Sequence, residues 1–525
     1  MADQTYLETS RDHVRTAALL SLVTAILGAA AYAWMVTVYH PAQNYPNFGQ
    51  EIYDQYWLAI MDGRLDLPAR VLRYEGHYTP EGVGFLYHGA APLITRALAA
   101  PFIPIGSVNL APYSIAFWAI LGTAFYHLAF LAAARGAMRR QTENGVAENW
   151  SMAPFWAVVL GVTLWFGGVG VLLVANVSLY HEPIAVCFGL GAIFLWLWSR
   201  VLASGWPVAK ILIGLAICAA IAVHARPHIA VALYLGTGLA ILFALWQDRA
   251  RAFAPALLAL AVLGAGGGAY LGLNQLRFGD MSTGHGTFEA GATQYGPSYF
   301  GIEEADGRRG QTFTEHGAFN IGRVPYSAVL YGVAIPYTPW TEAVHDYMER
   351  THLMLTEERY GFIRIERPDM GVLWMWAGFF VAAFAAFRAP RADFAAAAAP
   401  LLTSAIAAVF VLSYATITLR YRIDLWIALG PLVFLGVGVL APRLASSKGS
   451  AGRIMALACL CGLAANLFIA LLYTANFRSD WRFFADWTEE HCLEQAAGLS
   501  LSEAQIGSLC RPPLPPGGQA GGDAE

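Results

Sequence analysis

The sequence predicts an all-α polytopic membrane protein with about eleven transmembrane helices. The first observation is composition, since 57% of the 525 residues are hydrophobic and only 13% are charged, whereas soluble domains average about 25% charged residues. The second is the recurrence of apolar runs long enough to cross a bilayer, which takes about 20 residues. The net charge of −4 and the lack of a basic run give no indication of nucleic-acid binding.

The apolar runs divide the chain into membrane spans and connecting loops. Runs of spanning length occupy roughly 17–38, 109–134, 153–175, 183–203, 209–225, 228–246, 254–275, 370–388, 392–417, 423–441 and 453–474. A further apolar stretch, Gly84–Pro104, is interrupted by polar residues and prolines. We expect it to be a half-buried or re-entrant piece.

This division predicts the organisation of the chain and its orientation. We expect a cytoplasmic N-terminus (1–16), a transmembrane module (17–275) with an acidic first outer loop (39–104), a long outer loop (276–369), C-terminal transmembrane helices (370–474) and an outer tail (475–525), disordered from about residue 511. Arginines and lysines of the short loops fall on one side if the N-terminus is cytoplasmic. The first run lacks a small-residue cleavage site and is interpreted as a retained anchor.

The residue pattern of the first outer loop predicts a short helix. Tyr53, Tyr56, Trp57 and Ile60 follow helical spacing and form one apolar stripe. The polar residues Glu51, Asp54, Gln55 and Asp62 fall on the other face. Such a helix is expected in the membrane interface, with its aromatic residues toward lipid and its carboxylates toward water or a cavity. A second amphipathic stretch near Trp340–Arg359 is expected to lie on the membrane or to cap the site.

Cysteine positions separate into two kinds. Four of the six lie inside apolar runs, where a small buried residue is ordinary. Cys492 and Cys510 flank a polar segment of the tail, which the charge pattern places outside the cytoplasm. Disulfides form in such a compartment, so this pair is expected to be bonded.

Several motifs lie on the same predicted side of the membrane. They are YDQYWLAIMDGRLDLP and YEGHYTPEGVGFLYHGAAPLI in the first outer loop, the YHE turn after the third span, the RP of HARPH, and NQLRFGD at the start of the long loop. Their order resembles the GT-C superfamily of polyprenol-phosphate-sugar-dependent membrane glycosyltransferases, as far as about Asp280. The first loop has no DxD or ExD pair, which departs from the metal-dependent members.

The resemblance implies an inverting transferase at the periplasmic face of a bacterial inner membrane. It would move a hexosyl or pentosyl group from a polyprenyl-phosphate carrier to a lipid-linked glycan, a lipopolysaccharide or a protein. Donor, acceptor and lipid bilayer would then be its partners. The sequence leaves the need for a cofactor open, and a divalent metal, Mg²⁺ or Mn²⁺, is the candidate.

Asp54 is the carboxylate that we expect to act as general base. Sugar transfer from a lipid phosphate needs a base that takes the proton of the acceptor hydroxyl. Between Tyr53 and Tyr56, desolvation would raise the pKa of Asp54 toward neutral pH. Glu51, one turn earlier, is the second candidate. The alternative is a hydrated, inert acid on the wet face of the helix.

Arginines near span ends are candidates for holding the donor phosphate. Arg226, Arg420 and Arg422 are chosen because a guanidinium binds phosphate bidentately and stays charged. The alternative is that they anchor helix ends at lipid headgroups. Because Arg420 and Arg422 are two residues apart, we expect one of them to point away from the site.

The remaining site candidates carry weaker signals. Tyr180, His181 and Glu182 could bind the substrate or a metal ion, although Glu182 is equally suited to stabilise a helix N-terminus. Candidates for the acceptor site are Tyr53, Tyr74, Glu75, His77 and Tyr78.

Two other functions remain open. A flippase or transporter for a lipid-linked sugar would place polar residues near mid-membrane and show repeat symmetry. Here the polar groups cluster at span ends and no repeat is evident. An O-antigen-type ligase or polymerase would use a late outer loop, and the loop 275–370 keeps that alternative open.

Overall fold

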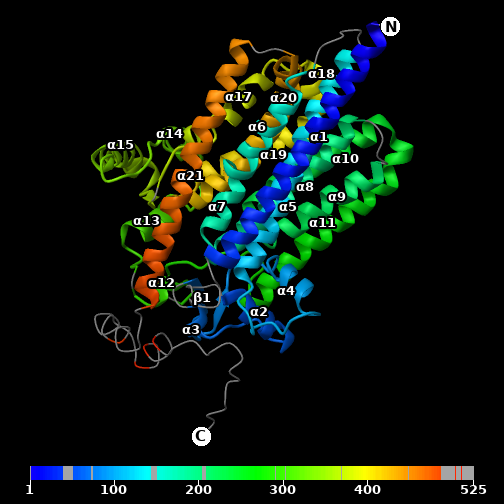
Figure 1. Ribbon diagram of the computed structural model, residues 1–525. Coiled ribbons are helices and arrows are strands. Elements are labelled where there is room, and N and C mark those ends of the chain that lie inside the picture. Colours follow the sequence, from blue (N-terminus) through cyan, green and yellow to red (C-terminus); the bar gives the residue numbers. More distant parts are fainter. Residues whose placement is uncertain are drawn as a thin grey trace.

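The computed structural model describes residues 2–39, 51–72, 75–143, 150–203, 208–289, 291–301, 303–367, 369–446 and 449–485, with single residues 493, 503, 506 and 510. The chain folds into a bundle of long helices, with short helices and strands gathered mainly at one end (Figure 1). We call this the loop end. The N-terminus lies at the opposite, N-terminal end.

Within the described residues, eight helical segments are long and apolar enough to cross a membrane. They are α1 (Ala2–Trp34, continued by the π-helical turn Met35–Tyr39), α5 (Ala111–Glu143), α6 (Ala153–Phe166) with α7 (Val169–Ala175), α8 (His181–Ala203), α10 (Pro227–Gln247), α11 (Arg249–Phe278), α20 (Leu419–Ser446) and α21 (Ser450–Ala485). Three shorter apolar helices join them: α9 (Val208–Ala222), α17 (Ala377–Ala386) and α19 (Ala398–Ser413).

These helices confirm the predicted fold class. Each of the eleven apolar runs of the sequence coincides with one of these eight segments or three shorter helices. The chain is an all-α polytopic membrane protein. The interrupted stretch Gly84–Pro104 holds only the strand β2 (Gly84–Leu86) and the short helix α4 (Leu93–Ala99), so it does not span, as expected.

The first outer loop is a folded unit at the loop end. It comprises α2 (Ile52–Met61), α3 (Ala69–Leu72), β1 (Gly76–Tyr78), β2 and α4. Strand β1 pairs antiparallel with β2 and with β3 (Gln294–Tyr295), and His77 lies opposite both Phe85 and Tyr295. The sheet therefore joins the first outer loop to the long loop that follows α11.

The expectation that the aromatic stripe of α2 faces lipid is wrong. Tyr53 and Tyr56 are fully buried in a local core with Leu72, Tyr78 and Leu179. The loop folds back over this stripe, so the large apolar surface is buried in protein rather than in lipid. Asp54 is buried as well, at 3% exposure, instead of facing water.

The long loop contributes most of the remaining short elements. They are α12 (Gly296–Tyr299), α13 (Arg308–Glu315), the 3₁₀ turn Ile321–Arg323, α14 (Val324–Val333), α15 (Glu342–Tyr360) and β4 (Arg364–Ile365). Strand β4 pairs in parallel with β5 (Thr416–Ile417). The short helices α16 (Val372–Met375) and α18 (Arg391–Ala396) flank α17.

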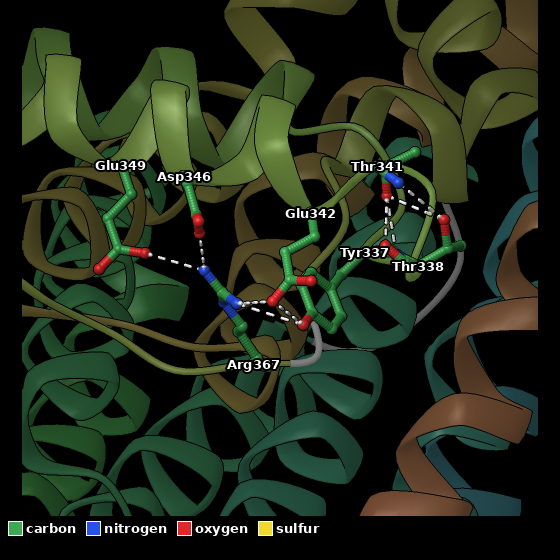
Figure 2. A network of polar contacts seen from close by, with 7 residues as sticks. All are labelled: Tyr337, Thr338, Thr341, Glu342, Asp346, Glu349 and Arg367. Atoms are coloured by element: carbon green, nitrogen blue, oxygen red, sulfur yellow. Dashed lines mark hydrogen bonds and ion pairs between the residues drawn. The ribbon is translucent and has the colours of Figure 1, made fainter.

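Helix α15 is the amphipathic helix predicted near Trp340–Arg359, and Arg367 fixes its first half. Figure 2 shows the guanidinium between the acids of the helix, 2.5 Å from Asp346 and 3.5 Å from Glu349, with the Tyr337 hydroxyl 3.2 Å away. Near its C-terminal end, Glu357 pairs with Arg308. The exposed side of the helix carries large apolar residues, among them Tyr347 and Met354, and Trp340 just before the helix is also exposed.

A close backbone crossing ties the first outer loop to the turn between α9 and α10. The amide of Ala91 donates to the carbonyl oxygen of His224 at 2.8 Å. A Cβ atom at Gly89 would lie 2.0 Å from the same oxygen, so only glycine allows this approach. The crossing brings the loop of His88 next to the turn of Arg226.

Candidate functional site

A buried ion network joins three helices at the loop end. Arg96 of α4 donates through Nε to Asp54 Oδ1 of α2 at 2.8 Å, and through Nη1 and Nη2 to both oxygens of Glu182 in the first turn of α8. The second oxygen of Asp54 accepts the backbone amide of Leu110 at 3.1 Å. Arg96 and Glu182 are fully buried. The first outer loop is thereby locked to the helical bundle.

The network changes the chemistry expected of Asp54. Burial raises the pKa of its carboxyl group, and the neighbouring Arg96 opposes that shift. The sequence analysis also expects burial to raise the pKa of Asp54. Both carboxylate oxygens accept hydrogen bonds from the protein and the residue is only 3% exposed, however, so in this arrangement an acceptor hydroxyl does not reach them.

A second group of charges surrounds Tyr180, directly before α8. The guanidinium of Arg420 lies 4.2 Å from the centre of the Tyr180 ring and 3.0 Å from a carboxylate oxygen of Glu366. Glu75, half-buried in the turn before β1, forms a hydrogen bond with Tyr180. Burial raises the pKa of Glu75, while the Tyr180 hydrogen bond and Arg420 oppose the shift. A carboxylate, that of Glu75, and a guanidinium, that of Arg420, therefore both contact the side chain of Tyr180.

Arg226 adds a second guanidinium close by. It pairs with Asp424, and His228 Nε2 lies 3.7 Å from the same carboxylate. The guanidinium carbons of Arg226 and Arg420 lie 5.1 and 5.6 Å from the centre of the Tyr421 ring. The structure thus brings Arg226 and Arg420 together around Tyr421, although they come from different parts of the chain.

Arg422 does not join this group. It is fully buried, pairs with Asp369 and lies 4.7 Å from the Tyr331 ring. Helix α20 begins at Leu419, so both arginines are helical. Side chains at positions i and i+2 of a helix point in directions about 200° apart. The expectation that one of Arg420 and Arg422 points elsewhere therefore agrees with the structure, and Arg422 connects α20 to the segment before α16.

A cavity of about 870 Å³ lies beside Arg226. Its walls come from the first outer loop, the starts of α10 and α20, the end of α19 and the segment 282–289. Ring-bearing side chains dominate the lining, among them Tyr87, His88, Phe288, Tyr414 and Tyr421. Aromatic walls combined with cationic and hydrogen-bonding groups are suited to a polar ligand with flat apolar faces.

The other predicted residues occupy fixed places in the protein. His181 is bonded on both ring nitrogens, to Ser178 at 3.0 Å and to Tyr473 at 2.9 Å. His77 accepts the amide of Gly286 and stacks on Tyr87. Tyr78 stacks on Tyr299.

Four further predictions concern Glu51, Tyr74 and the two tail cysteines. Glu51 is half-buried at the start of α2. Cys510 is disulfide-bonded. Tyr74 and Cys492 lie outside the described residues, so the pairing of Cys492 with Cys510 stays a prediction.

Metal binding receives no support from the side chains that the structure describes. Among them, no group of three or more His, Cys, Asp or Glu residues is placed to hold a metal ion. Glu182, a candidate ligand, already binds Arg96 through both oxygens. The divalent metal named in the sequence analysis therefore stays a prediction.

Sequence reasoning missed the partners of the residues that it selected. Arg96 is one of the polar residues that interrupt the apolar stretch Gly84–Pro104, and neither it nor Asp424 nor Glu366 is among the predicted site residues. A charged residue in an apolar helix normally has a partner, so Arg96 in LITRALA and Asp424 in LRYRIDLW were detectable as members of ion pairs. Which acid pairs with which arginine depends on contacts between distant segments.

Fold and site together define a polytopic membrane protein with a charged, aromatic site at one end of its bundle. No protein-family model and no curated protein matches the chain. Among solved structures, the apo form of the Archaeoglobus fulgidus oligosaccharyltransferase is similar, with 13% identity and a TM-score of 0.43 over 87% of this chain and 56% of that one. The chain thus spans little more than half the length of that protein, and this likeness assigns no activity.

Proposed function

We propose that the protein is an inverting membrane glycosyltransferase of the GT-C type, which uses a polyprenyl-phosphate sugar as donor. The observation that carries this proposal is the convergence of Arg226 and Arg420 around Tyr421, with the half-buried Glu75 hydrogen-bonded to Tyr180 beside Arg420. Two fixed cations and a carboxylate are what transfer of a sugar from a lipid phosphate to a hydroxyl requires.

The arginines would bind the phosphate of the donor. Arg226 Nε has no hydrogen-bond partner among the described residues, although the residue is only 8% exposed. A buried donor without a partner costs free energy that a bound anion would recover. As the bond to the sugar breaks, negative charge grows on the leaving phosphate, and fixed guanidinium groups stabilise it more in the transition state than in the ground state.

Glu75 is the base in this proposal, and Asp54 is a positioning residue. A base has to reach the hydroxyl that it deprotonates. Glu75 retains exposed surface, whereas both oxygens of Asp54 are occupied. Asp54, selected from the sequence, stays the second candidate, since release of Arg96 would free one oxygen. The proposed acceptor is a glycan, lipid or protein hydroxyl that enters beside Glu75.

A lipid-extract comparison tests the function. Cells with the wild-type gene are compared with deletion cells and with cells that carry Glu75→Gln at equal membrane levels. A transferase predicts accumulation of a polyprenyl-phosphate sugar and loss of one sugar from a surface glycan in both altered strains. If the deletion strain shows both changes, whereas the Glu75→Gln and Asp54→Asn strains behave like the wild type, a transport function explains the result better.

Arg420→Gln is expected to lower kcat/KM for the lipid donor by about 10–100-fold, because a charge-assisted contact to the phosphate is lost. Donor extracted from the deletion cells provides the substrate. The matched control is Arg367→Gln, which removes a partly exposed arginine of the long loop that pairs with acids of α15 instead of Glu366 (Figure 2). Equal losses in both variants would contradict a phosphate role for Arg420.

The transfer rate is expected to rise with pH through the pKa of Glu75. A base acts in its ionised form, and burial places this pKa above the ordinary value of 4.5. The acid limb of the pH–rate profile, where the rate falls as the base is protonated, should therefore lie above pH 4.5. Because Arg420 lowers the pKa of Glu75, Arg420→Gln should move the limb to higher pH. A limb that survives in Glu75→Gln and vanishes in Asp54→Asn would assign the base to Asp54.

A further inference from the structure

A second cavity lies at the N-terminal end of the bundle, remote from the proposed active site. It has a volume of about 650 Å³ and lies between α1, α5, α8 and α20. Four arginines line it: Arg135, Arg139, Arg140 and Arg200. None of them takes part in the contacts of Arg96, Arg226 or Arg420, so the proposed active site does not explain this cavity.

The cavity is lined by positive charge, of which part is balanced by ion pairs. Arg140 lies 3.3 Å from Asp393, which also lines the cavity, and Arg139 lies 3.6 Å from Glu143. Arg135 lines the same cavity and has no acidic partner among the described residues, where the ion pairs of this helix are those of Arg139 and Arg140. At least this guanidinium is not balanced by a described carboxylate, and the cavity favours an anion.

His127 adds a directed hydrogen-bond donor on the cavity wall. Its side chain is 3% exposed, and its Nδ1 accepts the indole N–H of Trp165 at 3.3 Å. A neutral imidazole that accepts at Nδ1 carries its proton on Nε2. Nε2 has no partner among the described residues. His127 therefore offers a buried N–H to a ligand that accepts hydrogen bonds.

The walls between these polar groups are apolar and reach the outer surface of the bundle. Ala18, Leu22, Ala25, Leu128 and Leu131 line the cavity. Leu22 and Leu128 are 57% and 47% exposed, on helices that are long and apolar enough to cross the membrane. A ligand that fills this space needs an anionic group and apolar chains that can lie along α1 and α5.

We infer that this cavity binds an anionic phospholipid, with its phosphate on Arg135, Arg200 and His127 and its acyl chains along Leu22 and Leu128. Basic pockets between membrane helices bind such headgroups. The lipid would fill the space between α1 and its neighbours in the bundle. The shared chemistry is the phosphate group, which free phosphate also supplies, and the apolar opening favours the lipid.

Native mass spectrometry of the full chain in detergent tests this inference. Phosphatidylglycerol, phosphatidylethanolamine and inorganic phosphate are titrated separately into the wild type and into Arg135→Gln/Arg200→Gln. We expect phosphatidylglycerol to bind the wild type and the double variant to bind it about 30-fold more weakly. The matched control, Arg249→Gln/Arg251→Gln, removes two exposed arginines at the start of α11 and should bind like the wild type.

Wild-type measurements alone keep the inference testable if the double variant does not fold. Phosphatidylglycerol should raise the unfolding temperature of the wild type more than phosphatidylethanolamine does, and inorganic phosphate should not reproduce the effect. Equal stabilisation by both lipids, or equal binding by the double variant and the control, would overturn the site. Stabilisation by inorganic phosphate to the same extent would overturn the lipid as its ligand.

Discussion

Glu75→Gln is expected to reduce sugar transfer by about 10²–10⁴-fold, the range that general-base catalysis contributes. The amide keeps the shape of the side chain and can still accept the Tyr180 hydrogen bond, but it cannot take a proton from the acceptor. The rate is measured by pulse labelling of the surface glycan in cells with equal membrane levels of the two proteins. The variant should show the same unfolding temperature as the wild type to within a few degrees.

Glu81→Gln provides the matched control for this variant. Glu81 lies exposed in the turn between β1 and β2, in the same loop as Glu75, and its replacement should leave transfer unchanged. Asp54→Asn should retain more activity than Glu75→Gln, since an amide oxygen can still accept from Arg96. If Asp54→Asn is inactive and Glu75→Gln is fully active, the proposed base is wrong.

Arg96→Met is expected to lower the free energy of unfolding by about 3–5 kcal/mol, the cost of breaking a buried ion pair. Asp54 and Glu182 would then lie buried with no cation between them. The change is measured by thermal unfolding of the purified protein in detergent. Arg64→Met, which removes an exposed arginine of the same loop, should have little effect.

A combined variant separates the charge of Arg96 from its packing. In Asp54→Asn/Arg96→Met/Glu182→Gln no charge is left in the network, so much of the lost stability should return. If the triple variant is as unstable as Arg96→Met, packing around the arginine stem is the main contribution. If Arg96→Met is as stable as the wild type, the network does not hold the loop to the bundle.

The sequence predicts the helical bundle well because membrane insertion depends on local composition. Each apolar run is recognised within its own length, so even the short helices α9, α17 and α19 are found. The aromatic stripe of α2 is misplaced for the same reason. Its spacing shows that one face is apolar, but whether Tyr53 and Tyr56 contact lipid or protein depends on how the loop folds back.

The site is predicted less completely, because its geometry joins residues that are distant in the chain. Arg226 and Arg420 can be chosen from their chemistry, yet their convergence depends on Tyr421 and on the packing of both α10 and α20 against α19. Asp54 is correctly expected to have a raised pKa. Its partner Arg96 cannot be assigned from spacing alone, because 42 residues separate them.

The Arg96 network also constrains the order in which the chain can be assembled during synthesis. Arg96 and Asp54 emerge from the ribosome early, whereas Glu182 follows 86 residues after Arg96, when α5, α6 and α7 have already been made. Until α8 enters the membrane, α4 carries a guanidinium that lacks its second carboxylate. The first outer loop can therefore dock fully only after the fourth span is inserted, so a nascent chain stalled before α8 should leave this loop open to protease.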